Sequence, residues 1–381
     1  MKDSLHAVFI LTKLELGGAQ KVCLSLFKGL KKFGAKTTLI SGNEGPLVKE
    51  LKGLDNVFLL NSFKREVGLK TIWLEIKTFF KIISILRKLK KETPKIIVHT
   101  HSTKAGLLGR FAALLAGVKV RVHTVHGFGF NDFQPKLKWF IIYFLEALVC
   151  LITTHYICVS NADLNEGSRR LPGFKKKSSI IRAAVEWEKF YIPAKKEKSF
   201  KEKYSFVFGS ISCFKPQKNL FDLLKAFKIV FDSVSQKNLY LQIIGDGEQR
   251  EDLEGWIKKN NLQGHVDLLG WQSDVSSWMQ NWDAYVMSSL WEGLPIAIVE
   301  ARMLKLPVVS YSIGGIPDII VDGQNGYLVK PKKIKTLAEK MLSILKDKNL
   351  YEKMSLCKED LSEFNDDFMI RKHYETFSKL F

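Results

Sequence analysis

Two glutamates in the second half of the chain have the type and spacing to recognise paired hydroxyl groups. Glu292 and Glu300 lie in the run Leu290–Ala301, which has the sequence LWEGLPIAIVEA. The run follows an apolar strand, and Pro295 favours the start of a helix that contains Glu300. A carboxylate accepts hydrogen bonds at both oxygens, so it suits the adjacent hydroxyls of a sugar or a ribose. A solvated helix residue remains the alternative for Glu300.

Glycines and lysines at other strand ends have the chemistry to bind a phosphate. Gly17 and Gly18 open the first helix, where free backbone N–H groups meet an anion. The loop Ser212–Asn219 brings Lys215 and Lys218 to a later strand end, and a lysine supplies a point charge for a diphosphate. The first loop lacks the GxGxxG pattern, which disfavours a nicotinamide cofactor. Each feature alone also fits a turn or a solvated lysine.

Two further glycine loops follow predicted strands. One is Ile244–Arg250, which contains Gly245 and Asp246, and the other is Ser312–Asp318. Each of these loops, taken singly, is more often only a turn.

Four histidines, His99, His101, His123 and His126, end two predicted strands. A zinc cluster is one interpretation. Because both pairs fall at the ends of parallel strands that face a cleft, we favour a role for His126 at the reacting site. His101 is expected near an acceptor, next to Ser102.

The elements that must position these residues alternate between strand and helix. Apolar runs such as Lys95–His99 and Val120–Val125 predict buried parallel strands. The segment Leu69–Lys91 has a helical period, and we expect its apolar stripe to face inward. A second strand and helix series begins at Phe206–Ile211. The sequence therefore predicts an α/β protein with two Rossmann-like parallel-sheet domains that face each other across a cleft.

Length and composition also indicate two domains. The 381 residues exceed the roughly 250–300 at which a single core stops growing. With 46% hydrophobic and 26% charged residues, the chain has the composition of a folded globular protein. We place the first domain at residues 1–185, the second at 186–365 and a linker at Glu186–Lys203. The C-terminal helix 366–381 is expected to pack back onto the first domain.

The net charge of +20 predicts an anionic partner for the first half of the chain, which carries most of the excess. Nucleic acid is not expected, because no zinc finger or basic aromatic motif is present. The basic face of Leu69–Lys91 and the aromatic residues beside Lys136 and Lys138 suit an anionic membrane surface. A solvated basic face is the alternative.

The location predicted from sequence is the cytoplasm, peripheral on the inner face of the membrane. Five cysteines without a CxxC pair indicate reduced thiols. The apolar run at Ala7–Leu11 is too short for a signal peptide. A membrane span at Leu137–Val159 is disfavoured by Lys138 and Glu146 within it, so we expect a buried helix with an exposed apolar edge, followed by a core strand.

Taken in order, the motifs resemble those of a known enzyme family. They are GGA near the N-terminus, VHG, CVSNA, KPQKN, GDGE, the Glu292/Glu300 pair in a WEGLP context, GGIPD and DGQNGYLV. This order is similar to that of the retaining nucleotide-sugar glycosyltransferases of family 4, which have the two-Rossmann GT-B fold. The resemblance runs from roughly Leu11 to Val329.

The resemblance implies a role for each matched residue on the sugar side of the donor. Glu300 would bind the ribose of the nucleotide. Glu292, with the backbone amides of Gly293 and Leu294, would hold hydroxyls of the donor sugar. His126 would lie near the reacting sugar and bond its 6-hydroxyl.

On the phosphate side, the resemblance assigns the leaving diphosphate to the amides of Gly17 and Gly18 and to Lys218. The family's usual arginine is replaced by Cys213, so either Lys215 takes over its charge or the phosphate contact is weaker. Similar enzymes need no metal, so no cofactor is predicted.

The predicted reaction transfers a sugar from a nucleotide sugar, with UDP favoured, to a saccharide or a polyisoprenyl-diphosphate-linked acceptor. The setting would be bacterial surface polysaccharide or lipopolysaccharide synthesis. A sugar-nucleotide epimerase or hydrolase on the same fold is the alternative.

Overall fold

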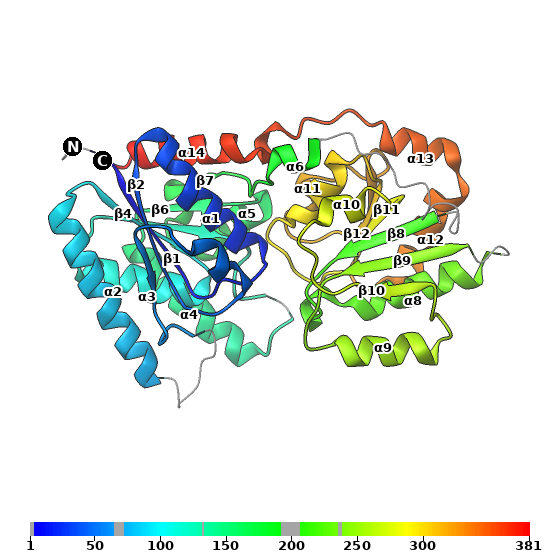
Figure 1. Cartoon of the computed structure of the whole chain (residues 1–381), viewed down its shortest axis with the longest axis horizontal. Helices are drawn as coiled ribbons and strands as arrows, with labels where there is room; N and C mark the ends of the chain where they lie inside the picture. The colour runs from blue at the N-terminus through cyan, green and yellow to red at the C-terminus, as the bar shows by residue number, and fades with distance from the viewer. Residues whose placement is uncertain (1–3, 65–71, 132, 192–205, 235–237) are drawn as a thin grey trace. The chain divides into compact units, whose positions relative to one another are not determined.

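The chain forms two compact units, each built on its own parallel sheet. The computed structural model describes residues 4–64, 72–131, 133–191, 206–234 and 238–381. The first unit contains Met1–Ala184 and Ser362–Phe381, and the second contains Val185–Leu361. Figure 1 shows the helices around each sheet. The α/β class and the two Rossmann-like parallel sheets predicted from the sequence are confirmed.

The first unit has a seven-stranded parallel sheet in the order β3-β2-β1-β4-β5-β6-β7. Its strands are β1 (His6–Leu11), β2 (Lys36–Ser41), β3 (Val57–Leu59), β4 (Ile96–His101), β5 (Val120–Val125), β6 (His155–Cys158) and β7 (Ser178–Ile180). The chain first builds outward from β1 on one side and then from β4 on the other. The switch in direction therefore falls between β1 and β4.

Helices cover both faces of this sheet. They are α1 (Gly18–Gly29), α2 (Ile72–Glu92), α3 (Thr103–Leu115), α4 (Lys136–Ile152), α5 (Asn161–Arg170) and α14 (Asp366–Ser378). Successive side chains of a strand point to opposite faces, so Val8 and Ile10 join the core with α2 and α3. Phe9 points the other way, toward the ring of His99, which neighbours His373 of α14. The C-terminal helix α14 belongs to this unit and lies beside α1 (Figure 1).

The second unit has a six-stranded parallel sheet in the order β10-β9-β8-β11-β12-β13. Its strands are β8 (Phe206–Ile211), β9 (Leu239–Ile244), β10 (Val266–Leu268), β11 (Ala284–Met287), β12 (Val308–Tyr311) and β13 (Gly326–Val329). Its helices are α6 (Trp187–Tyr191), α8 (Leu220–Asp232), α9 (Arg250–Lys259), α10 (Val275–Met279), α11 (Ile296–Met303), α12 (Ile334–Lys346) and α13 (Lys348–Ser355). The switch in direction falls between β8 and β11. Helix α6 occupies the start of the predicted linker, and the rest of that linker lies outside the described residues.

Helix α2 differs from its prediction along its first half. Its later positions are buried, including Ile82 and Leu86, but Trp73 is 74% exposed and Phe80 is 63% exposed. The expectation of an apolar stripe that faces inward is therefore wrong for the first turns. A 21-residue helix is about 31 Å long. Because a six-residue strand such as β4 spans only about 20 Å, part of α2 has no strand beneath it.

Helix α4 departs further from prediction. The expected core strand after it is present as β6, with Tyr156 and Cys158 fully buried. The expected burial of this helix is wrong for most of its length, because the side chains of α4 that are buried are Glu146, Val149 and Cys150, whereas the expected exposed apolar edge is present and extends along the whole helix. Along the described residues, no helix is both long and apolar enough to cross a membrane.

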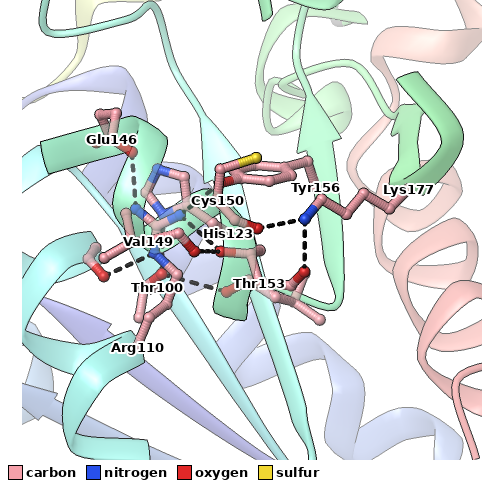
Figure 2. A network of polar contacts seen from close by, with 11 residues as sticks. Thr100, Arg110, His123, Glu146, Val149, Cys150, Thr153, Tyr156 and Lys177 are labelled. Atoms are coloured by element: carbon pink, nitrogen blue, oxygen red, sulfur yellow. Dashed lines mark hydrogen bonds and ion pairs between the residues drawn. The ribbon is translucent and has the colours of Figure 1, made fainter. Parts of the chain in front are cut away.

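A buried ion pair explains why a charged side chain of α4 is buried while most of its apolar side chains are exposed (Figure 2). The Arg110 guanidinium of α3 donates to Glu146 of α4 at 2.9 Å, and the exposed fractions of the two side chains are 0% and 4%. Arg110 also donates to the Thr153 hydroxyl at 3.0 Å and the Tyr156 hydroxyl at 2.9 Å. Removing one partner of a buried pair leaves an uncompensated charge and costs about 3–5 kcal/mol. The pair therefore fixes which side of α4 faces the sheet.

Candidate active site

The switch point of the second unit brings together two of the residues that the sequence analysis assigned to the nucleotide sugar, Lys218 and Glu292. Lys218 ends the loop after β8, and Glu292 lies in the loop after β11. The Lys218 ammonium and the Glu292 carboxylate form an ion pair, with 18% and 11% of their side chains exposed. Ligands of open α/β sheets bind outside the carboxyl ends of the strands at such a point. The pair stands where a ligand would be expected.

Backbone and side-chain hydrogen bonds hold these two loops together. The Gln217 side-chain amide donates to the Trp291 carbonyl at 2.8 Å, and the Leu290 amide donates to the Gln217 carbonyl at 2.8 Å. The Ser288 hydroxyl donates to the Asn219 carbonyl at 2.9 Å. Sequence reasoning missed both residues, because Gln217 is an uncharged member of the KPQKN motif and Ser288 belongs to no charged or glycine-rich motif. These bonds hold the two loops together and so keep Lys218 and Glu292 next to each other.

Glu300 is buried beside the same strand ends. It lies on α11, which follows Pro295, and only 5% of the residue is exposed. The pKa of the Tyr285 hydroxyl is raised, chiefly by burial and further by the charges of Glu300 and Glu292. The alternative of a solvated helix residue is therefore wrong for Glu300. A buried carboxylate near a second one suits the recognition of hydroxyl groups.

Two glycines allow loops to approach each other closely at this edge. A Cβ on Gly314 would lie 2.0 Å from the Glu292 carbonyl oxygen, and one on Gly245 would lie 1.8 Å from the Ser212 carbonyl oxygen. Both have positive φ, at 49° and 134°. In addition, the Gly315 amide donates to the Gly293 carbonyl at 2.6 Å. The GGIPD loop therefore packs against the backbone of Glu292 and Gly293 and helps to fix the segment Gly293–Leu294.

The hydrogen bonds of the Asp246 side chain are made within its own segment of the chain. Its carboxylate accepts from the Gly247 amide at 2.7 Å and from the Arg250 guanidinium at 2.8 Å. The hydrogen bond from Arg250 is the main reason that the pKa of Asp246 is lowered. A direct contact between Asp246 and a nucleotide stays a prediction.

Lys215 and Cys213 lie in the same loop as Lys218. Lys215 precedes the 3₁₀ turn Pro216–Lys218, and both Lys215 and Cys213 are half-buried. The Arg250 guanidinium stacks on Phe214 of this loop at 5.3 Å from the ring centroid. Arg250 is a further cation at this loop, besides Lys215 and Lys218, and sequence reasoning assigned it no role. Substitution of Lys215 tests whether its charge replaces that of the arginine absent at Cys213.

The switch point of the first unit gathers the glycine loop and the serine predicted near the acceptor. Gly17 caps α1 in an extended conformation, and the first amides of the helix have no carbonyl of their own helix to bond. The Ser102 hydroxyl lies 2.9 Å from the Thr12 hydroxyl, which joins the loops after β1 and β4. Ser102 has a φ of 69°, which is unusual for a residue with a side chain.

His101 and His126 contact each other at the same edge. His101 Nδ1 lies 2.9 Å from His126 Nε2. His101 is fully buried behind the half-buried His126, so it holds that ring rather than reaching outward. Burial, and then the charge of His373, lower the pKa of His126 to about 3. The His126 imidazole is therefore neutral near pH 7 and suits a hydrogen bond to a hydroxyl.

His99 and His123 take separate places. His99 bonds the Thr124 hydroxyl at 2.7 Å, whereas His123 bonds the Thr100 hydroxyl at 2.8 Å on the opposite face of the sheet. Within the described ranges, no group of three or more His, Cys, Asp or Glu is arranged to hold a metal ion.

Comparisons with known proteins define the class of this fold and site. The model described as Glycosyltransferase Family 4 matches residues 16–187, and the model described as Glycosyl transferases group 1 matches residues 192–356. The Anabaena protein HepE, solved in complex with UDP and glucose, superposes with a TM-score of 0.81 at 18% identity, over 98% of this chain and all of that one. The fold is GT-B, and the class is glycosyltransferase.

Relatives with named activities identify the family within this class. The chain is 34% identical to the UDP-Gal:α-D-GlcNAc-diphosphoundecaprenol α-1,3-galactosyltransferase of Escherichia coli, over 88% of this chain and 86% of the relative. It is 23% identical to the Campylobacter jejuni N,N′-diacetylbacillosaminyl-diphospho-undecaprenol α-1,3-N-acetylgalactosaminyltransferase, over 88% and 94%. The chain therefore belongs to the family 4 glycosyltransferases and is an enzyme of that family.

Substituting the two glutamates should separate binding from turnover. Glu300→Gln should raise the dissociation constant for the nucleotide sugar roughly tenfold, because a charge-assisted hydrogen bond becomes a neutral one. Glu292→Gln should chiefly lower kcat, since its contact strengthens as positive charge develops on the donor sugar. Calorimetry and initial rates measure the two effects, with the exposed Glu339→Gln on α12 as the control. Unchanged kinetics in both site variants would falsify the assignment.

Lysine substitutions test the diphosphate contact. Lys218→Ala should cost about 2–4 kcal/mol of transition-state stabilisation, the amount typical of one preorganised electrostatic donor. Lys215→Ala, compared through kcat/KM under the same conditions, shows whether that lysine replaces the arginine absent at Cys213. A silent Lys215→Ala beside a severe Lys218→Ala makes Lys215 a solvated loop residue. If Lys218→Ala is also silent, the diphosphate is not bound here.

Proposed function

We propose that the enzyme transfers a sugar from a nucleotide diphosphate sugar to a saccharide on a polyisoprenyl diphosphate, with retention of configuration. UDP is the favoured nucleotide, and bacterial surface polysaccharide or lipopolysaccharide synthesis is the setting. The observation that carries the proposal is the Lys218–Glu292 pair at the switch point of the second unit, with Glu300 buried nearby. The names of the relatives support it, since both act on undecaprenol-diphosphate-linked sugars.

The second unit has the groups that the donor requires. In the reaction, the bond between the anomeric carbon and the diphosphate oxygen breaks, and the diphosphate keeps the electron pair. The oxygen of the acceptor hydroxyl bonds to the anomeric carbon, and its proton is released. Lys218 stabilises the negative charge that grows on the diphosphate. Glu300 would hold the ribose, while Glu292 and the Gly293–Leu294 backbone would hold the sugar.

The first unit has groups of a similar kind at its own switch point. The amides at the start of α1, at Gly17 and Gly18, favour an anion by their partial positive charge. His126 is neutral near pH 7, so we assign it a hydrogen bond to a sugar hydroxyl rather than proton donation. His101 orients His126, and Ser102 is the residue we propose on the acceptor side.

We also propose that transfer needs no metal cofactor. A lysine and a helix N-terminus supply positive charge of the kind that a divalent cation supplies to a leaving diphosphate in other enzymes. The enzyme would work at the inner face of the cytoplasmic membrane, where a polyisoprenyl-linked acceptor is presented. The basic residues of the first unit would favour an anionic leaflet.

A transfer assay tests this function. The enzyme is incubated with UDP-galactose, UDP-glucose or UDP-N-acetylglucosamine and with N-acetylglucosamine-diphosphoundecaprenol, with and without a chelator. We expect at least one sugar to reach the lipid at a rate that the chelator leaves unchanged, and the Glu292→Gln enzyme to be slower. Free sugar or an epimerised nucleotide as the main product, with an unmodified lipid, would favour a hydrolase or epimerase instead.

A further inference from the structure

One side of α4 presents an unbroken apolar stripe to solvent. Its residues recur at intervals of three and four, which places them on one face of a helix. Leu137 is 73% exposed at one end and Leu151 is 68% exposed at the other, about 21 Å away along the axis. Along the whole of α4, the stripe contains Leu137, Phe140, Ile141, Phe144, Leu145, Leu148 and Leu151.

The stripe faces outward because the opposite side of α4 is held by polar contacts. Figure 2 shows Glu146 paired with Arg110, and Lys177 donating to the carbonyls of Cys150 and Thr153 at the end of the helix. Turning the stripe inward would break the buried ion pair and leave its charges either exposed or buried without a partner. The apolar exposure is therefore a fixed property of the fold and not the result of a loosely packed helix.

The neighbouring helices also carry exposed apolar side chains. Helix α3 packs against both α2 and α4. On α3, Leu115 is 56% exposed, and Phe111 and Leu114 are also exposed. On α2, Trp73 is 74% exposed, and Ile76 and Phe80 are exposed as well. Large exposed apolar patches mark an interaction surface, and the stripe on α4 is such a patch.

The charges around the stripe select one kind of partner. Lys136 and Lys138 flank the first turn of the stripe, one on each side. Arg87 and Lys90 of α2 donate to the Leu115 and Gly117 carbonyls at the end of α3. Along the described lengths of α2, α3 and α4, the exposed charged side chains are basic, with Glu92 as the exception.

We propose that the α4 stripe inserts into an anionic lipid leaflet. Apolar side chains bordered by lysines match an interface in which acyl chains lie beneath acidic headgroups. A second copy of the chain fits less well, because two such faces would bring basic residues together. The inference rests on the proposed function for the location of the acceptor, but it names hydrophobic insertion by α4 as the main contact.

Vesicle co-sedimentation tests the insertion. The full chain should bind vesicles of phosphatidylcholine with phosphatidylglycerol, and Phe140→Ser/Phe144→Ser should reduce the partition coefficient about tenfold or more, because two large apolar side chains lose their burial in lipid. Ile229→Ser/Leu356→Ser, which removes two exposed apolar side chains of the second unit, is the matched control and should bind like the wild type. Circular dichroism verifies that both variants are folded.

A charge variant separates insertion from electrostatic attraction. Lys81→Gln/Lys88→Gln/Lys91→Gln should weaken binding at low salt but leave a salt-resistant part that the serine substitutions remove. If the serine variant binds like the wild type while the charge variant does not, insertion by α4 is overturned. Failure of the wild type to bind at low salt overturns it as well. So does a dimer, seen by sedimentation velocity, that the serine substitutions dissociate.

Activity distinguishes this inference from the proposed function. With a short-chain, water-soluble form of the sugar-diphosphate acceptor, the serine variant should match the wild type. With the undecaprenyl acceptor in vesicles, its rate should fall about as far as its vesicle binding. If no variant transfers sugar to either acceptor, the proposed function fails, and the co-sedimentation result still decides the role of the stripe.

Discussion

A parallel sheet that grows outward from its middle in both directions leaves two neighbouring loops that run apart, and this constraint places the candidate site residues of both units. In the second unit the gap lies between β8 and β11, where Lys218 and Glu292 meet. In the first it lies between β1 and β4, where Thr12 and Ser102 join the loops. Strand order therefore brings together residues that lie far apart in the sequence.

Each unit contains an ion pair, and the two pairs differ in how far they are exposed to solvent. In the second, Lys218 and Glu292 neutralise each other in a partly exposed place, where the proposed function has a diphosphate and hydroxyls compete for them. In the first, Arg110 and Glu146 are enclosed, so they are not available to a ligand and instead set the orientation of α4. The same type of contact is therefore proposed to bind a ligand at a strand end and is architectural beneath a helix, and burial makes the difference.

Periodicity and motif order were sufficient to predict the α/β class, the parallel strands and the strand-end position of the candidate residues. They were not sufficient for α4, because a strongly apolar segment gives no sign of which side is buried. Glu146 was the available signal, but its partner Arg110 is 36 residues away in the chain. Gln217 and Ser288 escaped prediction for a related reason: their value lies in hydrogen bonds between loops, which no local pattern reveals.

The burial of Glu300 was equally hidden, since a helical glutamate is usually solvated. His101 shows the limit of strand-end reasoning. The strand register placed it at the correct edge, but only the fold shows that it lies behind His126 and away from solvent.

Hydrogen exchange with and without UDP tests most directly that the strand-end loops of the second unit bind the nucleotide. The account predicts slower exchange in the loops after β8, β11 and β12, in residues 212–219, 288–296 and 312–318, and little change in residues 260–265, which precede β10 at the opposite, amino end of the strands. Protection confined to segments outside these three loops, or none at saturating UDP, would contradict it.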